Sequence, residues 1–379
     1  FPAKKMNFDN LLLLDLEVTP SSRIGELGAV MGKETLHAKK GAAKALAELT
    51  RFSAGAKALV GHNLIEHDLR YVRDADPRNA LLDLPVIDTL PLSPICFPEN
   101  PYHKLVKGYK LADEDRSDPV KDSKLSGKLL GDQIDVLKNL SDENPNLASL
   151  YRTFLTSEGI DPQAVRGYEM LFDDLGIPAL PNAEQARKIT AETLAEKTCK
   201  SALDEFLEND SFPREHHAYL VSWLLVSGSN SVLPHWVCLR HPRCVERIKA
   251  LREVPCSDPT CKYCPETHAP EKQLKKYFGF DEFRPEPSLA EGGSLQEAIV
   301  EAGMRNLPLL AILPTGGGKS LCFQIPALAN HYRSGALTIV LSPLQALIKD
   351  QVENLRRQTG MHSSIDAIYG LQSKPERGG

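Results

Sequence analysis

The sequence predicts a mixed α/β protein in which two α/β regions flank a mostly helical one. The apolar run Leu11–Val18 is typical of a buried strand. Residues 131–252 have the apolar spacing of helices, and a strand–glycine loop–helix pattern surrounds Gly318. The 379 residues, 42% of them apolar and 25% charged, are enough for two or three ordinary globular domains.

Composition excludes some classes of protein. The net charge of -5 argues against a generally basic nucleic-acid coat, but it allows a local basic channel or a site that takes positive charge from metal ions. No apolar run approaches the ~20 residues of a membrane helix, and the N-terminus has no signal-peptide core. We therefore expect a cytoplasmic protein, nucleoid-associated if it is bacterial, with no membrane partner.

Four regions follow from the element pattern. Residues 1–130 form the first α/β region, 131–252 a helical connector without a catalytic constellation, 253–273 a cysteine-containing linker, and 274–379 the second α/β region. In the first region we expect strands at Leu11–Val18, Ile24–Met31 and 85–90, with helices at Ala42–Phe52 and 64–72. In the last region we expect strands at 309–313 and 337–342, and helices at 319–330 and 343–357.

Two acids in the first predicted strand indicate a metal site. Asp15 and Glu17 are two residues apart, so both carboxylates lie on one face of the strand. Placing two acids side by side is costly unless a cation neutralises them, and paired divalent metals do so in phosphodiester cleavage. The alternative is a strand edge whose acids are solvated.

Two further acids favour the metal interpretation. Asp68 follows a Gly61-His62-Asn63 turn, and Asp122 lies in the first turn of a predicted helix that Asp118 caps. The alternative is that Asp122 only interacts favourably with the helix dipole and binds no metal.

Together these motifs resemble the DEDD superfamily of 3′–5′ exonucleases over about residues 8–130. The resemblance implies an RNase H-like domain in which Asp15, Glu17, Asp68 and Asp122 hold two Mg²⁺ or Mn²⁺ ions. It also implies hydrolytic release of nucleotides from a 3′ end, with His62 and Asn63 orienting the motif.

One part of the exonuclease pattern differs. The superfamily has a His five residues, or a Tyr four residues, before the last Asp, where this sequence has Ser117 and Asp118. His103 is a candidate substitute base, and the alternative is an ordinary surface histidine. The same loop interleaves basic and aromatic residues, namely Tyr102, Lys104, Lys107, Tyr109 and Lys110. This pattern suits binding of a single nucleic-acid strand, and a solvated loop face is the alternative.

A cysteine cluster predicts a structural Zn²⁺ site. The spacing Cys-x4-Cys-x2-Cys-x3-His suits tetrahedral zinc held by Cys256, Cys261, Cys264 and His268, and free thiols are the alternative. Four protein ligands leave no open position, so such a site pins the linker and is not catalytic. Cys238 and Cys244 are interpreted as buried thiols, and the alternative is that they and His241 are spare ligands.

A glycine-rich loop predicts nucleotide binding. It follows a predicted strand and opens a helix, and its candidate ATP-binding residues are Thr315, Gly316, Gly317, Gly318, Lys319 and Ser320. Lys319 is expected to reach the β- and γ-phosphates, and Ser320 to contact Mg²⁺. The strict P-loop has Gly where this sequence has Leu313.

Leu313 at this position and the residues around it resemble motif I of RecQ-family DNA helicases, which belong to superfamily 2. YFGFDEFRP resembles the segment before the helicase core, and TIVLSPLQALIKDQVENL resembles motif Ia, which contacts the DNA backbone. The resemblance covers about residues 274–379 and implies the first part of a RecA-like domain. It makes Gln296 the candidate adenine-reading residue, although PSLAEGGS is inserted before it.

The sequence after Lys319 has no DEAH-type box, and the second RecA-like domain with its arginine finger is not in it. Because phosphoryl transfer needs those parts, we expect no ATP hydrolysis or unwinding by this chain alone. The expected partners are DNA, single-stranded or with a 3′ end, and the missing helicase portion in cis or in trans.

The sequence thus predicts a metal-dependent 3′–5′ DNA exonuclease joined to an incomplete RecQ-like helicase. The combination resembles the exonuclease–RecQ architecture of Werner-type proteins, in DNA repair or in defence against foreign DNA. Three alternatives stay open: a catalytically weak DNA-end binding module, an exonuclease fold that only scaffolds a helicase completed elsewhere, and an RNA exonuclease.

Overall fold

The computed structural model describes residues 8–21, 23–39, 41–100, 103, 118–208, 212–227, 233–362 and 364–368. The chain divides into two compact units, each built from three segments. The first unit is Phe1–Thr193, Leu207–Ser222 and Pro234–Cys244, and the second unit is Leu194–Phe206, Trp223–Leu233 and Val245–Gly379. The domain limits drawn from the sequence stay a prediction.

The first unit contains a five-stranded mixed sheet in the order β3-β2-β1-β4-β5. Its strands are β1 (Leu11–Val18), β2 (Ile24–Met31), β3 (Glu34–Ala38), β4 (Ala58–Gly61) and β5 (Val86–Asp88). β1 pairs antiparallel with β2, and β2 antiparallel with β3, whereas β4 is parallel to both β1 and β5. The mixed α/β prediction is confirmed for this unit. β3, which has mostly exposed residues and no apolar run, was not predicted.

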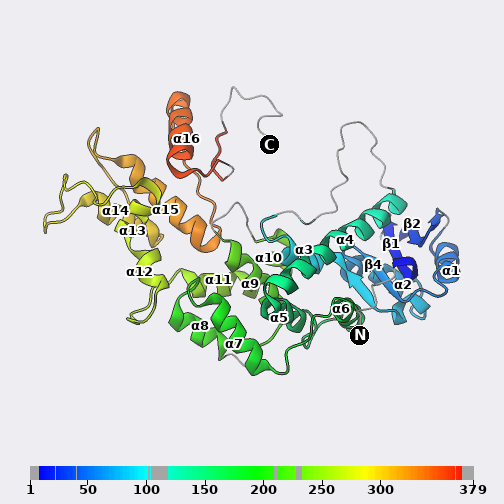
Figure 1. The fold of residues 1–379 in the computed structure, drawn as a ribbon. Coiled ribbons are helices and arrows are strands. Elements are labelled where there is room, and N and C mark those ends of the chain that lie inside the picture. The colour runs from blue at the N-terminus through cyan, green and yellow to red at the C-terminus, as the bar shows by residue number, and fades with distance from the viewer. Residues whose placement is uncertain are drawn as a thin grey trace. The chain divides into compact units, whose positions relative to one another are not determined.

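The two faces of β1 have different neighbours. Leu12, Leu14 and Leu16 are buried in a core with α1 (Ala42–Phe52) and α2 (Leu69–Ala75). The alternate residues of β1 face the long helix α4 (Pro119–Glu143), which runs along β1 and β2 (Figure 1). The predicted alternation is therefore confirmed, and it directs the side chains of Asp15 and Glu17 to the α4 side.

Short irregular segments follow the two parallel strands. After β4 the chain forms a π-helical turn, η2 (Leu64–Asp68), before α2, so the predicted helix at 64–72 is two elements. The predicted strand at 85–90 ends earlier, because Asp88 is the N-cap of α3 (Thr89–Cys96). Two short 3₁₀ turns are η1 (Phe8–Asn10) and η3 (Ala80–Asp83).

The helical prediction for residues 131–252 is confirmed. After α4 come α5 (Pro145–Leu155), α6 (Pro162–Asp174), α7 (Ala183–Leu194), α8 (Lys200–Leu207), α9 (Glu215–Val226), α10 (His235–Arg240) and α11 (Pro242–Arg252). α6 packs against β5 through Gly167, where a Cβ atom has no room beside the Val86 carbonyl. None of the helices described is long and apolar enough to cross a membrane.

The C-terminal part of the second unit is built on a small helical core. Its helices are α12 (Tyr263–His268), α13 (Pro270–Phe278), α14 (Leu295–Met304), α15 (Lys319–Ser334) and α16 (Gln345–Thr359). The core contains Leu274, Phe283, Val300, Met304, Ile325 and Ala329. The predicted helices at 319–330 and 343–357 correspond to α15 and α16.

The two strands predicted in this part are not formed within the described residues. Segments 309–313 and 337–342 make no strand ladder, and Leu310 and Leu341 are 90% and 91% exposed. A strand of a parallel sheet is stable when neighbours cover its edges and faces, and these segments have neither here. Apolar sequence alone was therefore an insufficient signal for strands.

The contact between β2 and α4 gives a stability prediction. A Cβ atom at Gly28 of β2 lies under 3.0 Å from backbone atoms of Pro119 and Val120 at the start of α4. Gly28→Ala is therefore expected to lower the free energy of unfolding by about 1–3 kcal/mol through overpacking. Urea unfolding of the full chain, followed by circular dichroism, measures the change.

Gly131→Ala is the matched control, because a Cβ atom there meets nothing within 4 Å. Since Gly131 lies inside α4, its replacement is expected to raise the free energy of unfolding by about 0.5–1 kcal/mol. Equal unfolding midpoints for both variants contradict the close-packing argument.

Candidate active site

Three of the four predicted acids converge at one place in the first unit. Asp15, Glu17 and Asp122 each offer a carboxylate oxygen, and these oxygens lie within 4.8 Å of one another. Asp15 and Glu17 are partly buried in β1, and Asp122 is buried in the first turn of α4. Such a group of oxygen ligands is suited to a hard divalent cation.

The start of α4 is held against β2 by a side-chain contact. The Ser123 hydroxyl lies 2.9 Å from the Gly28 carbonyl and 2.7 Å from the Pro119 carbonyl, and it donates to these oxygens. Gly28 is also the register partner of Asp15. The helix that carries Asp122 is thus anchored on the strand directly beside Asp15.

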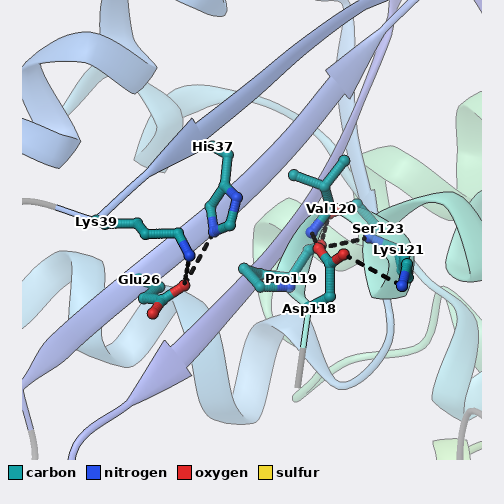
Figure 2. Close-up of polar contacts among 8 residues, drawn as sticks. All are labelled: Glu26, His37, Lys39, Asp118, Pro119, Val120, Lys121 and Ser123. Carbon is teal, nitrogen blue, oxygen red and sulfur yellow. Dashed lines mark hydrogen bonds and ion pairs between the residues drawn. The ribbon is translucent and has the colours of Figure 1, made fainter. Parts of the chain in front are cut away.

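Asp118 is occupied as the N-cap of α4, as the sequence predicted. Its carboxylate accepts hydrogen bonds from the amides of Val120 (3.1 Å) and Lys121 (3.3 Å), and the Lys121 ammonium lies 3.7 Å away (Figure 2). Burial raises the pKa of Asp118, but the two amides and Lys121 outweigh it and leave the pKa below its usual value. A carboxylate held in this way is a poor general base.

Asp68 lies beside β1 and is only 3% exposed. One oxygen accepts a hydrogen bond from the Leu16 amide at 2.9 Å, between the two acids of the strand, and the other lies 3.6 Å from Nδ1 of His67. β4 pairs with β1 only as far as Leu13, so Asp68 takes the place of a strand neighbour at Leu16. Burial raises the pKa of Asp68, and His67 opposes this effect.

Asp88, which the sequence analysis missed, organises the turn that contains His62 and Asn63. Its carboxylate accepts hydrogen bonds from the amides of Asn63 (2.7 Å), Ile65 (3.1 Å) and Leu90 (3.1 Å). Burial raises the pKa of Asp88 to about 6, while these amides lower it. Its position at the end of a short apolar strand, before a helix start, is the signal that could have identified it as a cap.

His62 is fixed as a neutral ring. Its Nδ1 lies 2.9 Å from the Thr89 hydroxyl, which donates to the Gly61 carbonyl at 3.0 Å. Burial lowers the pKa of His62 to about 4, and a hydrogen bond with the His103 backbone opposes this shift. The ring is therefore uncharged near neutral pH.

Arg240 of α10 brings a positive charge to the same turn. Its Nη2 donates to Oδ1 of Asn63 at 2.6 Å, and its guanidinium carbon lies 5.4 Å from the centroid of the Trp236 ring. Asn63 itself has a left-handed backbone with φ of 69°. No sequence signal indicated Arg240, because 177 positions separate it from Asn63.

His103, the candidate substitute base, is buried and next to the His62 turn. Its Nε2 lies 3.4 Å from the Phe97 carbonyl, and its Nδ1 has no hydrogen-bond partner among the residues the structure describes. Burial lowers the pKa of His103, which favours the neutral, proton-accepting ring. Ser117 and the loop residues Tyr102, Lys104, Lys107, Tyr109 and Lys110 lie outside the described residues.

In the second unit, the glycine loop is held by the residues predicted to read a nucleotide. Gly316 and Gly318 have φ of 83° and 75°, a conformation that favours glycine. Gln296 is 1% exposed, and its amide group donates to the Gly318 carbonyl at 2.9 Å and accepts from the Arg284 amide at 3.2 Å. Lys319 donates to the Leu313 carbonyl at 2.9 Å.

A pocket of 520 Å³ adjoins this loop. Gln296, Gly318 and Ser320 line it together with Phe278 and Arg284, which are two residues of the YFGFDEFRP segment. The remaining wall includes residues of α16 that were not predicted: Gln351, Asn354 and Gln358.

The cysteine cluster has a different fourth member from the one predicted. Sγ atoms of Cys256, Cys261 and Cys264 group with that of Cys199, all within 4.8 Å of one another. His268 is not in this group. Its Nδ1 lies 2.8 Å from the Arg333 guanidinium, and burial together with Arg333 lowers its pKa to about 4.

Sequence comparison relates the C-terminal part of the chain to helicases. Residues 294–378 match the DEAD/DEAH box helicase family. The chain is 38% identical over 107 residues to the ATP-dependent DNA helicase RecQ of Synechocystis, which covers 28% of this chain and 19% of the relative. It is 39% identical over 104 residues to ATP-dependent DNA helicase Q5 of Mus musculus (27% and 9%), and 39% identical over 112 residues to ATP-dependent DNA helicase Q4 of Homo sapiens (27% and 8%).

The chain spans a fifth or less of the length of these relatives. No solved structure matches the chain. The matches concern the helicase-type sequence, and the exonuclease assignment stays a prediction. The chain therefore carries, in its C-terminal part, a DEAD/DEAH box helicase region homologous to RecQ-type ATP-dependent DNA helicases.

Proposed function

We propose that the first unit is a metal-dependent 3′–5′ exonuclease that acts on a DNA strand. The convergence of Asp15, Glu17 and Asp122 is the observation that carries the proposal. Three carboxylates brought this close repel one another unless a cation lies between them. The DEDD-like order of the motifs supports the same interpretation.

The residues present fit a pair of Mg²⁺ or Mn²⁺ ions. Asp15, Glu17 and Asp122 supply oxygen ligands. Asp68 is bound to the amide of Leu16, the residue between Asp15 and Glu17 in β1. Bound metals of this kind activate water and stabilise the leaving oxygen in phosphodiester hydrolysis. The protein contributes a rigid frame, because β1 and the anchored first turn of α4 fix the ligands before the metal binds.

The surroundings of Asn63 are suited to a nucleic-acid strand. Arg240 supplies a cation beside the turn that contains His62 and Asn63, which we call the HN turn, and Trp236 supplies an aromatic ring next to that cation. Positive charge combined with aromatic rings is the usual way to hold single strands. Because the helicase relatives are named as DNA helicases, DNA is the substrate that we favour over RNA.

For the second unit we propose ATP binding at the glycine loop and DNA contact through the segment around α16. The pocket next to Gln296 and Ser320 supports the nucleotide site. The exposed segments 309–313 and 337–342 support pairing with further strands of a helicase core, supplied in cis or in trans. DNA repair and defence against foreign DNA are both compatible settings.

One observation favours a second candidate, a DNA-end binding module with little catalysis. Asp118 stands at one of the two positions of the usual base, and its hydrogen bonds commit it to capping α4. In that case the acids bind metal and a DNA end, but water activation is slow. The first experiment below separates the two candidates.

Asp15→Ala is expected to abolish 3′-end degradation, because it removes a ligand from the acid group. The rate should fall by roughly 10²-fold or more, because even the loss of a residue that only hydrogen-bonds to a metal ligand can lower activity by about 10²-fold. The assay uses 5′-labelled single-stranded DNA with Mg²⁺ or Mn²⁺, in which a ladder shortens from the 3′ end.

Asp132→Ala, an exposed acid later in α4, is the control and should keep the wild-type rate. Wild-type rates in Asp15→Ala contradict the proposed metal site. Intact DNA binding without a ladder in the wild type favours the end-binding module, and a ladder only on RNA favours the RNA exonuclease.

His103→Ala is expected to lower the exonuclease rate more than Ser117→Ala does. His103 is a neutral, buried imidazole near the HN turn, whereas a serine hydroxyl is too weak an acid or base for the role. Rates measured for both variants at saturating Mn²⁺ test the difference. If the two variants lose the same activity, His103 is not the substitute base.

Lys319→Ala is expected to weaken ATP binding by about 10-fold or more, the loss of one charge-assisted hydrogen bond to phosphate. Titration of the full chain with a fluorescent ATP analogue and Mg²⁺ measures the dissociation constant. Lys272→Ala, which removes a surface ion pair with Glu266, is the matched control. Unchanged affinity in Lys319→Ala excludes the glycine loop as the phosphate site.

A further inference from the structure

We propose that Cys199, Cys256, Cys261 and Cys264 form a structural Zn²⁺ site in the second unit, with Cys199 as the ligand that linear spacing conceals. All four Sγ atoms lie within 4.8 Å of one another. Tetrahedral zinc with bonds of ~2.3 Å places its sulfur ligands ~3.8 Å apart, so a small inward shift completes the site. This proposal is independent of the nuclease and nucleotide chemistry.

Backbone hydrogen bonds fix the position of Cys199 directly before α8. Its amide donates to the Leu251 carbonyl at 2.8 Å, and its own carbonyl accepts from the Leu203 amide at 2.9 Å, at the start of α8. The thiol of Cys199 is thereby held at the residue that precedes α8. It reaches the cluster from a position 57 residues before Cys256 in the sequence.

The other three cysteines are presented by a tight turn. The Asp258 carboxylate accepts from the Thr260 amide (2.8 Å) and hydroxyl (2.7 Å), and the Asp258 carbonyl accepts from the Cys261 amide at 3.1 Å. Cys264 follows in the first turn of α12. None of these hydrogen bonds uses sulfur, so the turn gathers the thiols by its own geometry.

Two backbone amides point at the sulfur atoms. The Lys200 amide lies 3.5 Å from Sγ of Cys261, and the Cys256 amide lies 3.4 Å from Sγ of Cys264. Amide donors of this kind stabilise metal-bound thiolates and orient them. The first of these contacts joins the two segments, because Lys200 follows Cys199 whereas Cys261 belongs to the other segment.

The arrangement suits one metal ion rather than two disulfides. A disulfide needs only two sulfurs in contact at ~2.05 Å, whereas here four sulfurs are mutually close and all the cysteines are free. Four protein ligands also close the coordination sphere, so the ion is structural. His268 is outside this group of ligand atoms, and its Nδ1 lies against the Arg333 guanidinium.

The site lies next to a buried arginine that connects several elements of the second unit. Arg252 is fully buried, and it donates to the carbonyls of Lys197 (2.8 Å) and Leu224 (3.0 Å). Its guanidinium also lies 5.8 Å from the Tyr263 ring and 5.5 Å from the Tyr332 ring of α15. Zinc at the cysteines therefore holds Lys197 and Tyr263 in place around Arg252, and through Tyr332 it supports the helicase region.

The test is the zinc content of the full chain, purified without chelators and measured by mass spectrometry. We expect about one equivalent in the wild type, less than about a fifth of that in Cys199→Ser, and a full equivalent in His268→Ala. Cys238→Ser, a half-buried thiol of the first unit, is the matched control and should keep its zinc. A wild-type chain without zinc overturns the assignment. So does a result in which His268→Ala loses its zinc while Cys199→Ser keeps it.

A second variant keeps the test valid if Cys199→Ser folds poorly. Cys199→His substitutes another zinc ligand, so it should retain the metal. With Co²⁺ in place of zinc, the sulfur-to-metal charge-transfer band should weaken in proportion to the lost thiolate, and the visible bands should move to shorter wavelength. Identical Co²⁺ spectra for wild type and Cys199→His show that Cys199 is not a ligand.

Discussion

The close approach of α4 to β2 at Gly28 is the constraint on which the acid cluster depends. Any Cβ atom there collides with the backbone of Pro119 and Val120. Ser123 then bonds the same strand through the Gly28 carbonyl, and Asp118 caps the helix start. With the first turn fixed in this way, Asp122 lies against the acids of β1 without any need for a ligand to assemble the group.

Backbone amides stabilise the buried acids around this group. Asp68 accepts from the Leu16 amide where β4 no longer pairs with β1, and Asp88 accepts from three amides of the turn and α3. Both carboxyls have raised pKa values because burial outweighs these donors. The hydrogen bonds from these amides offset part of the free-energy cost of burying the two carboxyls.

The second unit combines a small core with exposed apolar segments. Six buried side chains form the core of its C-terminal helices, while 309–313 and 337–342 make no strand ladder among the residues described. The Gln296–Gly318 contact and the hydrogen bonds of Arg252 connect segments of this unit that are distant in sequence. The metal that we propose at the four cysteines would cross-link Cys199 to the segment that carries the other three.

The sequence by itself determined the period-two alternation of β1, the capped start of α4 and the glycine loop, because each depends on residues close together in the chain. It also gathered Cys256, Cys261 and Cys264 within one short turn. Tertiary structure alone decided that Cys199 joins them, that Arg240 reaches Asn63, and that two apolar segments form no strands. These outcomes depend on neighbours distant in sequence, which local pattern and propensity do not encode.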